Sequence, residues 1–375
     1  MRLPALLLAA LLVAGCFSAT RPTSNVPVTG EPIVPFSGRV GHVFLIVLEN
    51  EGYETTFGAS PGSPYLGHAL PLQGRLLTQY YAVGHVSLDN YIAMISGQAP
   101  NPETEADCPV FTEFHEVTQV NGQAVGQGCV YPKDVKNLGD QLSASGHTWR
   151  MYAQDMAAGA PATCRHPPVD ARDPWEGASG PKDQYVTKHV PFVYFHGIID
   201  DKAACDAHVV DLKLLDEDLN NTTMPQFAFI SPNLCDDGHD SRCASGEPGG
   251  YSGIERFLSA WVPRITTSTA YRTDGLIIIA FDESESDSSA CCDEQPGYNT
   301  VQPGTPGGKA GDGGGRTGAL LLSPCFTNAT TDETPYNHYS LLRTLEAIYG
   351  VAPLGYAAQD GLKTIGLGAC PARGS

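Results

Sequence analysis

Positive charge is scarce in this chain of 375 residues, which has 22 lysine and arginine residues against 41 aspartate and glutamate residues and a formal net charge of -19. Nucleic acids and anionic membrane surfaces are bound by basic patches. The composition therefore argues against both as partners. A small anionic substrate would depend on local positive charge from a metal ion, histidines or helix N-termini.

A hydrophobic run long enough to span a membrane is also missing at the start of the chain, because the apolar stretch within MRLPALLLAALLVAGC is shorter than the ~20 residues required. One positive charge, this stretch and the segment VAGC instead match a bacterial lipoprotein signal. We expect a signal peptide over residues 1–15, a lipid anchor on Cys16 and a flexible tether over residues 16–38. This places the protein in the cell envelope. The alternative is an ordinary secretory signal and a freely secreted protein.

Repeated C-x-x-C pairs, which are typical of zinc sites, are absent although the chain has 11 cysteines. Without Cys16 an even number remains, and in an exported protein this indicates disulfides. The sequence does not determine their pairing. We expect the adjacent Cys291 and Cys292 to bond to two separate partners.

No internal repeat or linker interrupts the chain from about Gly41 to Pro371, which predicts one domain over residues 39–375. Short apolar runs alternate with helical patterns. This alternation predicts an α/β fold with a largely parallel central sheet flanked by helices. The expected strands are 42–48, 149–153, 226–231, 276–281 and 318–322, and the expected helices are 90–96, 137–145, 254–265 and 339–349.

Two acidic dipeptides follow strongly apolar runs. Glu49-Asn50 comes after HVFLIVL, and Asp282-Glu283 comes after LIIIAF. Parallel strands present ligand-binding side chains at their carboxyl ends, so the two pairs are expected to meet. Three carboxylates repel one another unless a cation neutralises them, and oxygen donors suit Mg²⁺, Mn²⁺ or Ca²⁺. The pairs therefore predict a divalent cation site. The alternative is two strands that end in polar turn residues.

The segment YYAVGHVSLDNYIAMISG places Ser87 directly before a helical run. One interpretation is a helix cap, for which serine is a common residue. The other is a nucleophile whose hydroxyl ligates the metal and attacks phosphorus. Asn90, one turn further, would then face the same site and donate to a phosphate oxygen.

Two further polar segments carry histidines. In FAFISPNLCDDGHDS, Asn233 and His239 are suited to supply hydrogen bonds or a proton, with Asp237 orienting the imidazole. The alternative is a turn rich in Asn and Asp. In NHYSLLRTLEAIYG, His338 begins an amphipathic helix, which is an anion-facing position, although such a histidine is also a common surface cap.

Residues 284–316 are dense in Gly, Pro, Ser and Asp and have no periodic apolar pattern. Long irregular loops are often functional. Because this one begins directly after Asp282-Glu283, we expect it to lie over the proposed site. The alternative is a surface excursion tied by disulfides.

The chain resembles the bacterial and fungal phosphoesterase family that contains acid phosphatases and phosphatidylcholine-type phospholipases C, within the alkaline phosphatase superfamily. The resemblance spans most of the chain and rests on five segments in a fixed order: VLENEGYETTFG, GHVSLDNY, SPNLCDDGHD, IAFDESESD and NHYSLLRTLEAIYG. It implies an alkaline phosphatase-like fold with one divalent metal ion. The residues that the resemblance assigns to this ion are Glu49, Asn50, Ser87, Asp282 and Glu283.

The resemblance also implies that Ser87 is transiently phosphorylated, with His239 and His338 near the phosphate. Glu283 stands where some relatives carry a second Asp, so its ligation is less secure than that of Asp282. The implied activity is metal-dependent hydrolysis of phosphate monoesters, as in acid phosphatases. The expected partner is a small phosphorylated substrate, and the membrane is contacted through the lipid anchor only.

Two other functions are compatible with this pattern. A phospholipase C-type reaction on phospholipid headgroups would use the same site, but the chain lacks an evident aromatic or basic surface helix and a choline-binding aromatic cage. A non-catalytic envelope lipoprotein would use an inherited fold to bind a ligand.

Overall fold

The computed structural model describes residues 39–221, 223–295, 297–299, 313–326 and 328–367. The predicted signal peptide, the anchor residue Cys16 and the predicted tether lie outside these ranges. They stay predictions, as does the domain boundary at residue 39.

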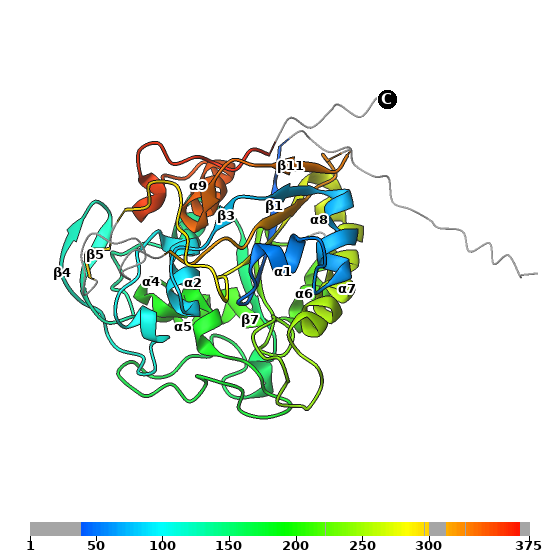
Figure 1. Cartoon of the computed structure of the whole chain (residues 1–375). Helices are drawn as coiled ribbons and strands as arrows, with labels where there is room; N and C mark the ends of the chain where they lie inside the picture. The colour runs from blue at the N-terminus through cyan, green and yellow to red at the C-terminus, as the bar shows by residue number, and fades with distance from the viewer. Residues whose placement is uncertain (1–38, 222, 296, 300–312, 327, 368–375) are drawn as a thin grey trace, which may run out of the picture. The chain divides into compact units, whose positions relative to one another are not determined.

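The largest sheet is mixed but mostly parallel (Figure 1). Its strands are β1 (His42–Leu48), β2 (Arg75–Leu77), β6 (Trp149–Ala153), β7 (Val209–Asp211), β8 (Phe227–Ser231), β9 (Gly275–Phe281), β10 (Ala319–Leu322) and β11 (Thr330–Asp332). They lie in the order β11-β2-β10-β9-β1-β8-β6-β7. In this sheet β10 runs against its neighbours β9 and β2, and the other paired strands are parallel. The predicted α/β class with a largely parallel sheet is confirmed.

Helices cover both faces of this sheet (Figure 1). The described α-helices are α1 (Tyr53–Phe57), α2 (Ser87–Ser96), α3 (Leu138–Ser145), α4 (His196–Ile199), α5 (Lys202–His208), α6 (Lys213–Asn220), α7 (Tyr251–Thr267), α8 (Thr269–Asp274) and α9 (His338–Tyr349). Val43 and Leu45 of β1 pack in the core formed with α2, α3 and α9, whereas Phe44 and Ile46 pack in the core formed with α6, α7 and α8. Alternate side chains of a strand point to opposite faces, so a strand covered on both faces is apolar throughout.

Two small sheets lie outside this layer and were not predicted. β12 (Tyr336–Asn337) pairs with β3 (Tyr80–Tyr81), and β4 (His115–Val120) pairs with β5 (Gln123–Gln127). The turn of the β4–β5 hairpin is Asn121-Gly122, whose φ angles are 51° and 76°. Asn-Gly suits this turn because both residues tolerate positive φ.

The five predicted strands and four predicted helices are all present, with one informative shift. Helix α2 begins at Ser87, three residues before the predicted start at residue 90. Ser87 is therefore the first residue of the helix and not a residue that precedes it. The strands that were missed in the large sheet are three residues long, which is too short for a periodic pattern.

Four disulfides join described cysteines: Cys108–Cys129, Cys164–Cys205, Cys235–Cys243 and Cys291–Cys292. The prediction that Cys291 and Cys292 have separate partners is wrong, since they are bonded to each other. The backbone turns at this point, with positive φ at Cys292 and Asp293, and the turn brings adjacent side chains together. Within the described ranges, no helix has both the length and the apolar composition needed to cross a membrane.

Glu346 on α9 is a carboxyl group buried in this fold, with an exposed fraction of 0%. One of its oxygens accepts a hydrogen bond from the Leu354 backbone N–H at 2.7 Å. Burial raises the pKa of Glu346 from 4.5 to about 8, although this hydrogen bond and the charge of Arg343 act in the opposite direction. The folded protein therefore keeps Glu346 protonated at pH values at which the unfolded chain ionises it.

We predict that Glu346→Gln stabilises the protein in a pH-dependent way. Between about pH 4.5 and pH 8 the folded state binds a proton that the unfolded state releases, so the free energy of unfolding of the wild type falls as the pH rises through this range. Glutamine does not titrate. The variant is expected to unfold with a free energy about 2–4 kcal/mol above the wild type at pH 8.5, and with little difference near pH 4.5.

Denaturant unfolding at both pH values measures this difference. Glu217→Gln on the exposed face of α6 is the control and should change little at either pH. An equal effect of Glu346→Gln at both pH values would contradict the prediction.

Candidate active site

The carboxyl ends of three adjacent strands, β9, β1 and β8, form the candidate site. Leu48 pairs with Phe281 in register, and the Asp282 N–H donates to the Leu48 carbonyl oxygen at 3.0 Å. The Glu49 N–H donates to the Asp237 carbonyl oxygen, also at 3.0 Å. This register brings Glu49, Asp237 and Asp282 together from three distant segments. All three side chains have an exposed fraction of 0%.

Glu49 is the centre of the contacts. Its Oε2 accepts a hydrogen bond from Ser87 Oγ at 2.9 Å, and its Oε1 accepts one from the Tyr91 hydroxyl at 2.5 Å. The same Oε1 lies 3.3 Å from His189 Nε2, and the other ring nitrogen of His189 lies 3.3 Å from Asp237 Oδ2. The predicted nucleophile is thus in direct contact with a predicted metal ligand.

His189 was missed by the sequence analysis. It lies on a 3₁₀ turn, Thr187–His189, and its ring stacks on Tyr91 with the centroids 5.1 Å apart. The only available signal was a Lys-His pair before the apolar run PFVYF. Such a pair is not specific for a site, because it does not follow a predicted strand and only the fold brings it to Glu49.

Several buried polar atoms at this edge have no hydrogen-bond partner among the described residues. They are Asn50 Oδ1, His189 Nδ1 and Nε2, Asp237 Oδ2 and Asp282 Oδ2. The 3.3 Å approaches of His189 to the carboxylates are close contacts without hydrogen-bond geometry. Buried polar atoms are nearly always satisfied. Ligand atoms of Glu49, His189 and Asp237 lie within 4.8 Å of one another, which fits a divalent cation with oxygen and imidazole ligands.

Electrostatics supports the same fit. Burial raises the pKa of Glu49 well above its usual value, and the charge of Asp237 raises it further. The pKa values of Asp237 and Asp282 are also raised, mainly by burial and then by the neighbouring carboxylates. Burial lowers the pKa of His189, helped by the charges of Lys188 and His239. A cation would lower the pKa values of the three carboxyl groups again, and the neutral form of His189 that burial favours is the form that binds a metal ion.

A strained turn presents Ser87 at the N-terminal end of α2. Val86 has a φ of 97°, which is unusual for a β-branched residue. Glu283 Oε1 accepts a hydrogen bond from the Val86 N–H at 2.9 Å, and Asn90 Nδ2 donates to the Val86 carbonyl oxygen at 3.0 Å. Such strain persists only where the surroundings over-determine it, and it is concentrated at functional sites.

A model of the Phosphoesterase family matches residues 68–352 of the chain. The chain belongs to the phosphoesterase family. It is 27% identical over 286 residues to the phosphate-repressible acid phosphatase of Penicillium chrysogenum, covering 76% of this chain and 54% of that protein. It is 25% identical over 316 residues to the phosphatidylinositol-3-phosphatase of Mycobacterium tuberculosis, covering 84% of this chain and 79% of that protein.

The chain is also 23% identical to an acid phosphatase of Aspergillus fumigatus, over 87% of this chain and 59% of that protein. The chain therefore spans little more than half the length of these two fungal relatives. A solved structure from Vibrio parahaemolyticus is described as a protein in the alkaline phosphatase superfamily. Its superposition covers 85% of this chain and 68% of that chain. Its TM-score is 0.49 at 13% identity, which is too weak to assign an activity.

Glu283 was predicted to bind the metal and Asn90 to bind phosphate, but both side chains support the turn at Ser87. Both oxygens of Glu283 are engaged there, by the Val86 N–H and by His85 Nδ1. Asn90 donates to the Gly84 and Val86 carbonyl oxygens and accepts from the Val83 and Gly84 N–H groups. Its carboxamide therefore has no donor left for a phosphate oxygen. The prediction that Asn90 donates a hydrogen bond to a phosphate oxygen is therefore corrected: Asn90 holds the turn before Ser87.

His338 of this phosphoesterase also differs from its predicted role. A carbonyl oxygen only accepts, so Nε2 carries the proton and donates to the Asp282 carbonyl oxygen at 2.6 Å, while Nδ1 accepts from the Tyr80 hydroxyl at 2.9 Å. Burial lowers the pKa of His338 to about 4. His338 is thus a neutral, buried residue that positions Asp282, and both of its nitrogens are occupied.

Of the remaining predicted residues, some lie at the site and others support the turns around it. Asn233 accepts hydrogen bonds from the Cys235 and Asp236 N–H groups and donates one to Asp155 Oδ2. It therefore holds the turn after β8 and does not face the site. Asp237 Oδ1 accepts from the backbone N–H of His239 and not from its ring. The His239 ring is partly exposed, 6.4 Å from the His189 ring between centroids.

The described part of the loop over residues 284–316 reaches the same segment. Ser288 Oγ lies 3.1 Å from His85 Nε2, and the Ser284 N–H donates to the Gly314 carbonyl oxygen. The loop thus borders the Ser87 turn. Residues 300–312 lie outside the described ranges.

We predict that Val86→Gly stabilises this phosphoesterase and impairs it. Glycine adopts positive φ without steric cost, so the release of strain should exceed its entropic cost and raise the free energy of unfolding by about 1 kcal/mol. Because the strained turn positions Ser87, turnover should fall about tenfold or more.

Thermal unfolding and an aryl phosphate assay measure the two effects. Val117→Gly, at an exposed position of β4, is the control and should lower stability by about 0.5–1 kcal/mol. A Val86→Gly variant that is both less stable and fully active would refute the role given to the strain.

Proposed function

We propose that the chain hydrolyses phosphate monoesters through a phosphoserine intermediate on Ser87, with the help of one divalent metal ion. Membership of the phosphoesterase family supports phosphoester hydrolysis, and several relatives are named acid phosphatases. The observation that carries the finer proposal is the 2.9 Å hydrogen bond from Ser87 Oγ to the buried Glu49 carboxylate. A hydroxyl beside a buried base and a cluster of unsatisfied ligand atoms has the features of an activated nucleophile.

The residues that would hold the ion are those with unsatisfied atoms, Asn50, His189, Asp237 and Asp282, together with Glu49 and the Ser87 hydroxyl. A divalent ion there supplies charge neutralisation at the phosphate and lowers the pKa of an oxygen nucleophile. Glu283 remains a weaker candidate ligand, since both of its oxygens hold the Ser87 turn.

The protein's own groups account for the remaining requirements. Glu49 Oε2 is placed to accept the Ser87 proton as the Oγ–P bond forms. The hydrogen bond from the Tyr91 hydroxyl fixes the orientation of the carboxylate. The first residue of α2 lies at the positive end of the helix, which favours a phosphate group. As Ser87 Oγ bonds to phosphorus, the ester P–O bond breaks and the alcohol leaves with a proton from solvent. Water then attacks phosphorus on the side opposite Ser87 Oγ and loses a proton to solvent. The Oγ–P bond breaks, Ser87 recovers its proton from Glu49, and phosphate is released.

The disulfides within the described residues support export, because disulfides persist in oxidising compartments. Lipid anchoring at Cys16 is part of the proposal. A substrate carried on a lipid headgroup also fits a phosphomonoesterase, and one relative is named a phosphatidylinositol-3-phosphatase.

We predict that Ser87→Ala folds normally and loses turnover of 4-nitrophenyl phosphate by at least about 10⁴-fold, because the attacking atom is removed. Acid quenching of the wild type with labelled substrate should leave phosphate on Ser87. Ser96→Ala, at the opposite end of α2, is the matched control and should remain active. Undiminished hydrolysis by Ser87→Ala would exclude this residue as the nucleophile.

A second prediction concerns the ion and has a readout other than activity. After treatment with a chelator, Asp237→Asn should be more stable than the wild type by about 1–3 kcal/mol at pH 7, because it removes one of three buried carboxylates that repel one another. A divalent ion that binds the folded state should raise the melting temperature of the wild type and raise that of the variant less.

Thermal unfolding with Mg²⁺, Mn²⁺, Ca²⁺ or Zn²⁺ added in turn tests this prediction. Asp216→Asn, an exposed change of the same type on α6, should behave as the wild type. Melting temperatures that respond to no ion would remove the metal from the proposal.

A further inference from the structure

Lys188 is a nearly buried lysine next to the candidate ligand His189. Its side chain has an exposed fraction of 11%, and its Nζ donates a hydrogen bond to Asp107 Oδ2 at 2.8 Å. Lysine is rarely buried unless it is paired. The 3₁₀ turn Thr187–His189 therefore delivers a fixed ammonium group as well as an imidazole to the site.

Asp107 ties this ammonium group to the nucleophile end of α2. Its other oxygen, Oδ1, accepts a hydrogen bond from the Leu88 N–H at 3.0 Å, one residue after Ser87. Asp107 has a φ of 57° and is followed by Cys108, which is bonded to Cys129. Because a disulfide and a helix terminus both constrain Asp107, the position of Lys188 is fixed by rigid parts of the fold.

The charge of Lys188 acts on the carboxylate cluster. The ammonium group interacts electrostatically with Glu49 and Asp282 as well as with Asp107. Three buried carboxylates carry more charge than one divalent ion neutralises. A substrate with two negative charges therefore requires a further cation in the site.

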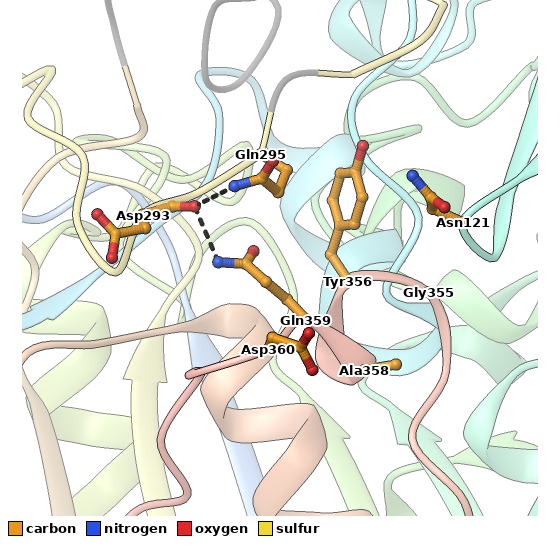
Figure 2. A pocket seen from close by; sticks show the side chains of 8 residues that line it. All are labelled: Asn121, Asp293, Gln295, Gly355, Tyr356, Ala358, Gln359 and Asp360. Atoms are coloured by element: carbon orange, nitrogen blue, oxygen red, sulfur yellow. Dashed lines mark hydrogen bonds between the residues drawn. The ribbon is translucent and has the colours of Figure 1, made fainter.

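A pocket beside the segment after α9 does not offer such a cation. It has a volume of about 580 Å³ and lies between the turn of the β4–β5 hairpin and the segment after α9 (Figure 2). Its charged lining residues are Asp293 and Asp360, and no lysine or arginine lines it. Two carboxylates disfavour a phosphate group. Among the described sites, the Ser87 end of α2 is thus the better place for an anionic ester.

We propose that Lys188 determines specificity by favouring dianionic phosphate monoesters over monoanionic phosphate diesters at Ser87. This inference rests on the proposed function. The ammonium group interacts with one more negative charge in a monoester than in a diester, and in a partly desolvated site one unit of charge has a large effect on affinity. The family resemblance left the choice between monoesters and diesters open, and Lys188 decides it in favour of monoesters.

The test compares Lys188→Met and Lys188→Arg with the wild type on 4-nitrophenyl phosphate and bis(4-nitrophenyl) phosphate. Lys188→Met should lower kcat/KM for the monoester roughly 10- to 100-fold and change that for the diester by no more than about threefold. Lys188→Arg keeps the charge and should stay within about fivefold of the wild type on both esters. Equal losses on the two esters would mean that Lys188 is structural and would overturn the proposal.

Two controls separate charge from folding. Lys202→Met removes a lysine that is paired with Asp206 in the same way but is 75% exposed on α5, and it should leave both reactions unchanged. The double variant Lys188→Met with Asp107→Asn leaves no unpaired carboxylate behind. It should melt near the wild-type temperature and should still show the selective loss on the monoester. A recovered monoester rate in this variant would contradict the proposal.

Binding of inorganic phosphate and of dimethyl phosphate, measured by calorimetry, tests Lys188 without turnover. Lys188→Met should weaken phosphate binding roughly 10- to 100-fold and dimethyl phosphate binding much less. Unchanged phosphate affinity would overturn the role of Lys188. If the wild type hydrolyses neither ester, the proposed function fails, and the phosphate measurement still decides whether Lys188 selects the dianion.

Discussion

The packing of carboxylates at one edge of the sheet is the constraint on which the rest of the site depends. Glu49 and Asp282 directly follow the adjacent strands β1 and β9, whose register places them side by side. Asp237 lies in the turn after β8 and is held there by the Glu49 N–H, and all three are fully buried. Burial of like charges costs free energy unless a counter-charge is present. The orphaned atoms of Asn50 and His189 beside them indicate what that counter-charge is: a cation that accepts oxygen and nitrogen ligands. In the proposed function, the chemistry at Ser87 uses this costly arrangement.

A second group of residues holds Ser87, the proposed nucleophile, against this cluster. Glu283 and Asn90 fix the strained Val86, and His338 fixes the backbone of Asp282. These residues belong to the motifs that carry the family resemblance, yet their atoms face the backbone and not a substrate. A motif therefore marks both the groups that react and the groups that hold them. Side-chain hydrogen bonds distinguish the two kinds.

The elements that could be predicted were those with a strong local pattern. The runs that became β1 and β9 are apolar throughout because both faces of the sheet are covered, and this pattern is visible in the sequence. The strands of three residues were not predictable, since they exist only through pairing with longer neighbours. For the same reason His189 was missed: its turn has no periodic signal, and its place beside Glu49 depends on packing against Tyr91.

The sequence by itself determined the fold class and the ends of the central strands, because strand ends follow directly from local hydrophobic patterns. The joint assignment of Ser87 and Glu49 to one site came from the family resemblance. The tertiary structure decided which polar residues face the site. The side chains of Asn90, Asn233 and His338 bind neighbouring backbone and side-chain groups of the protein and not a substrate. His189 lies beside Glu49, and Lys188 pairs with Asp107. The direction of a side chain depends on contacts between segments that are distant in sequence, and no local pattern encodes those contacts.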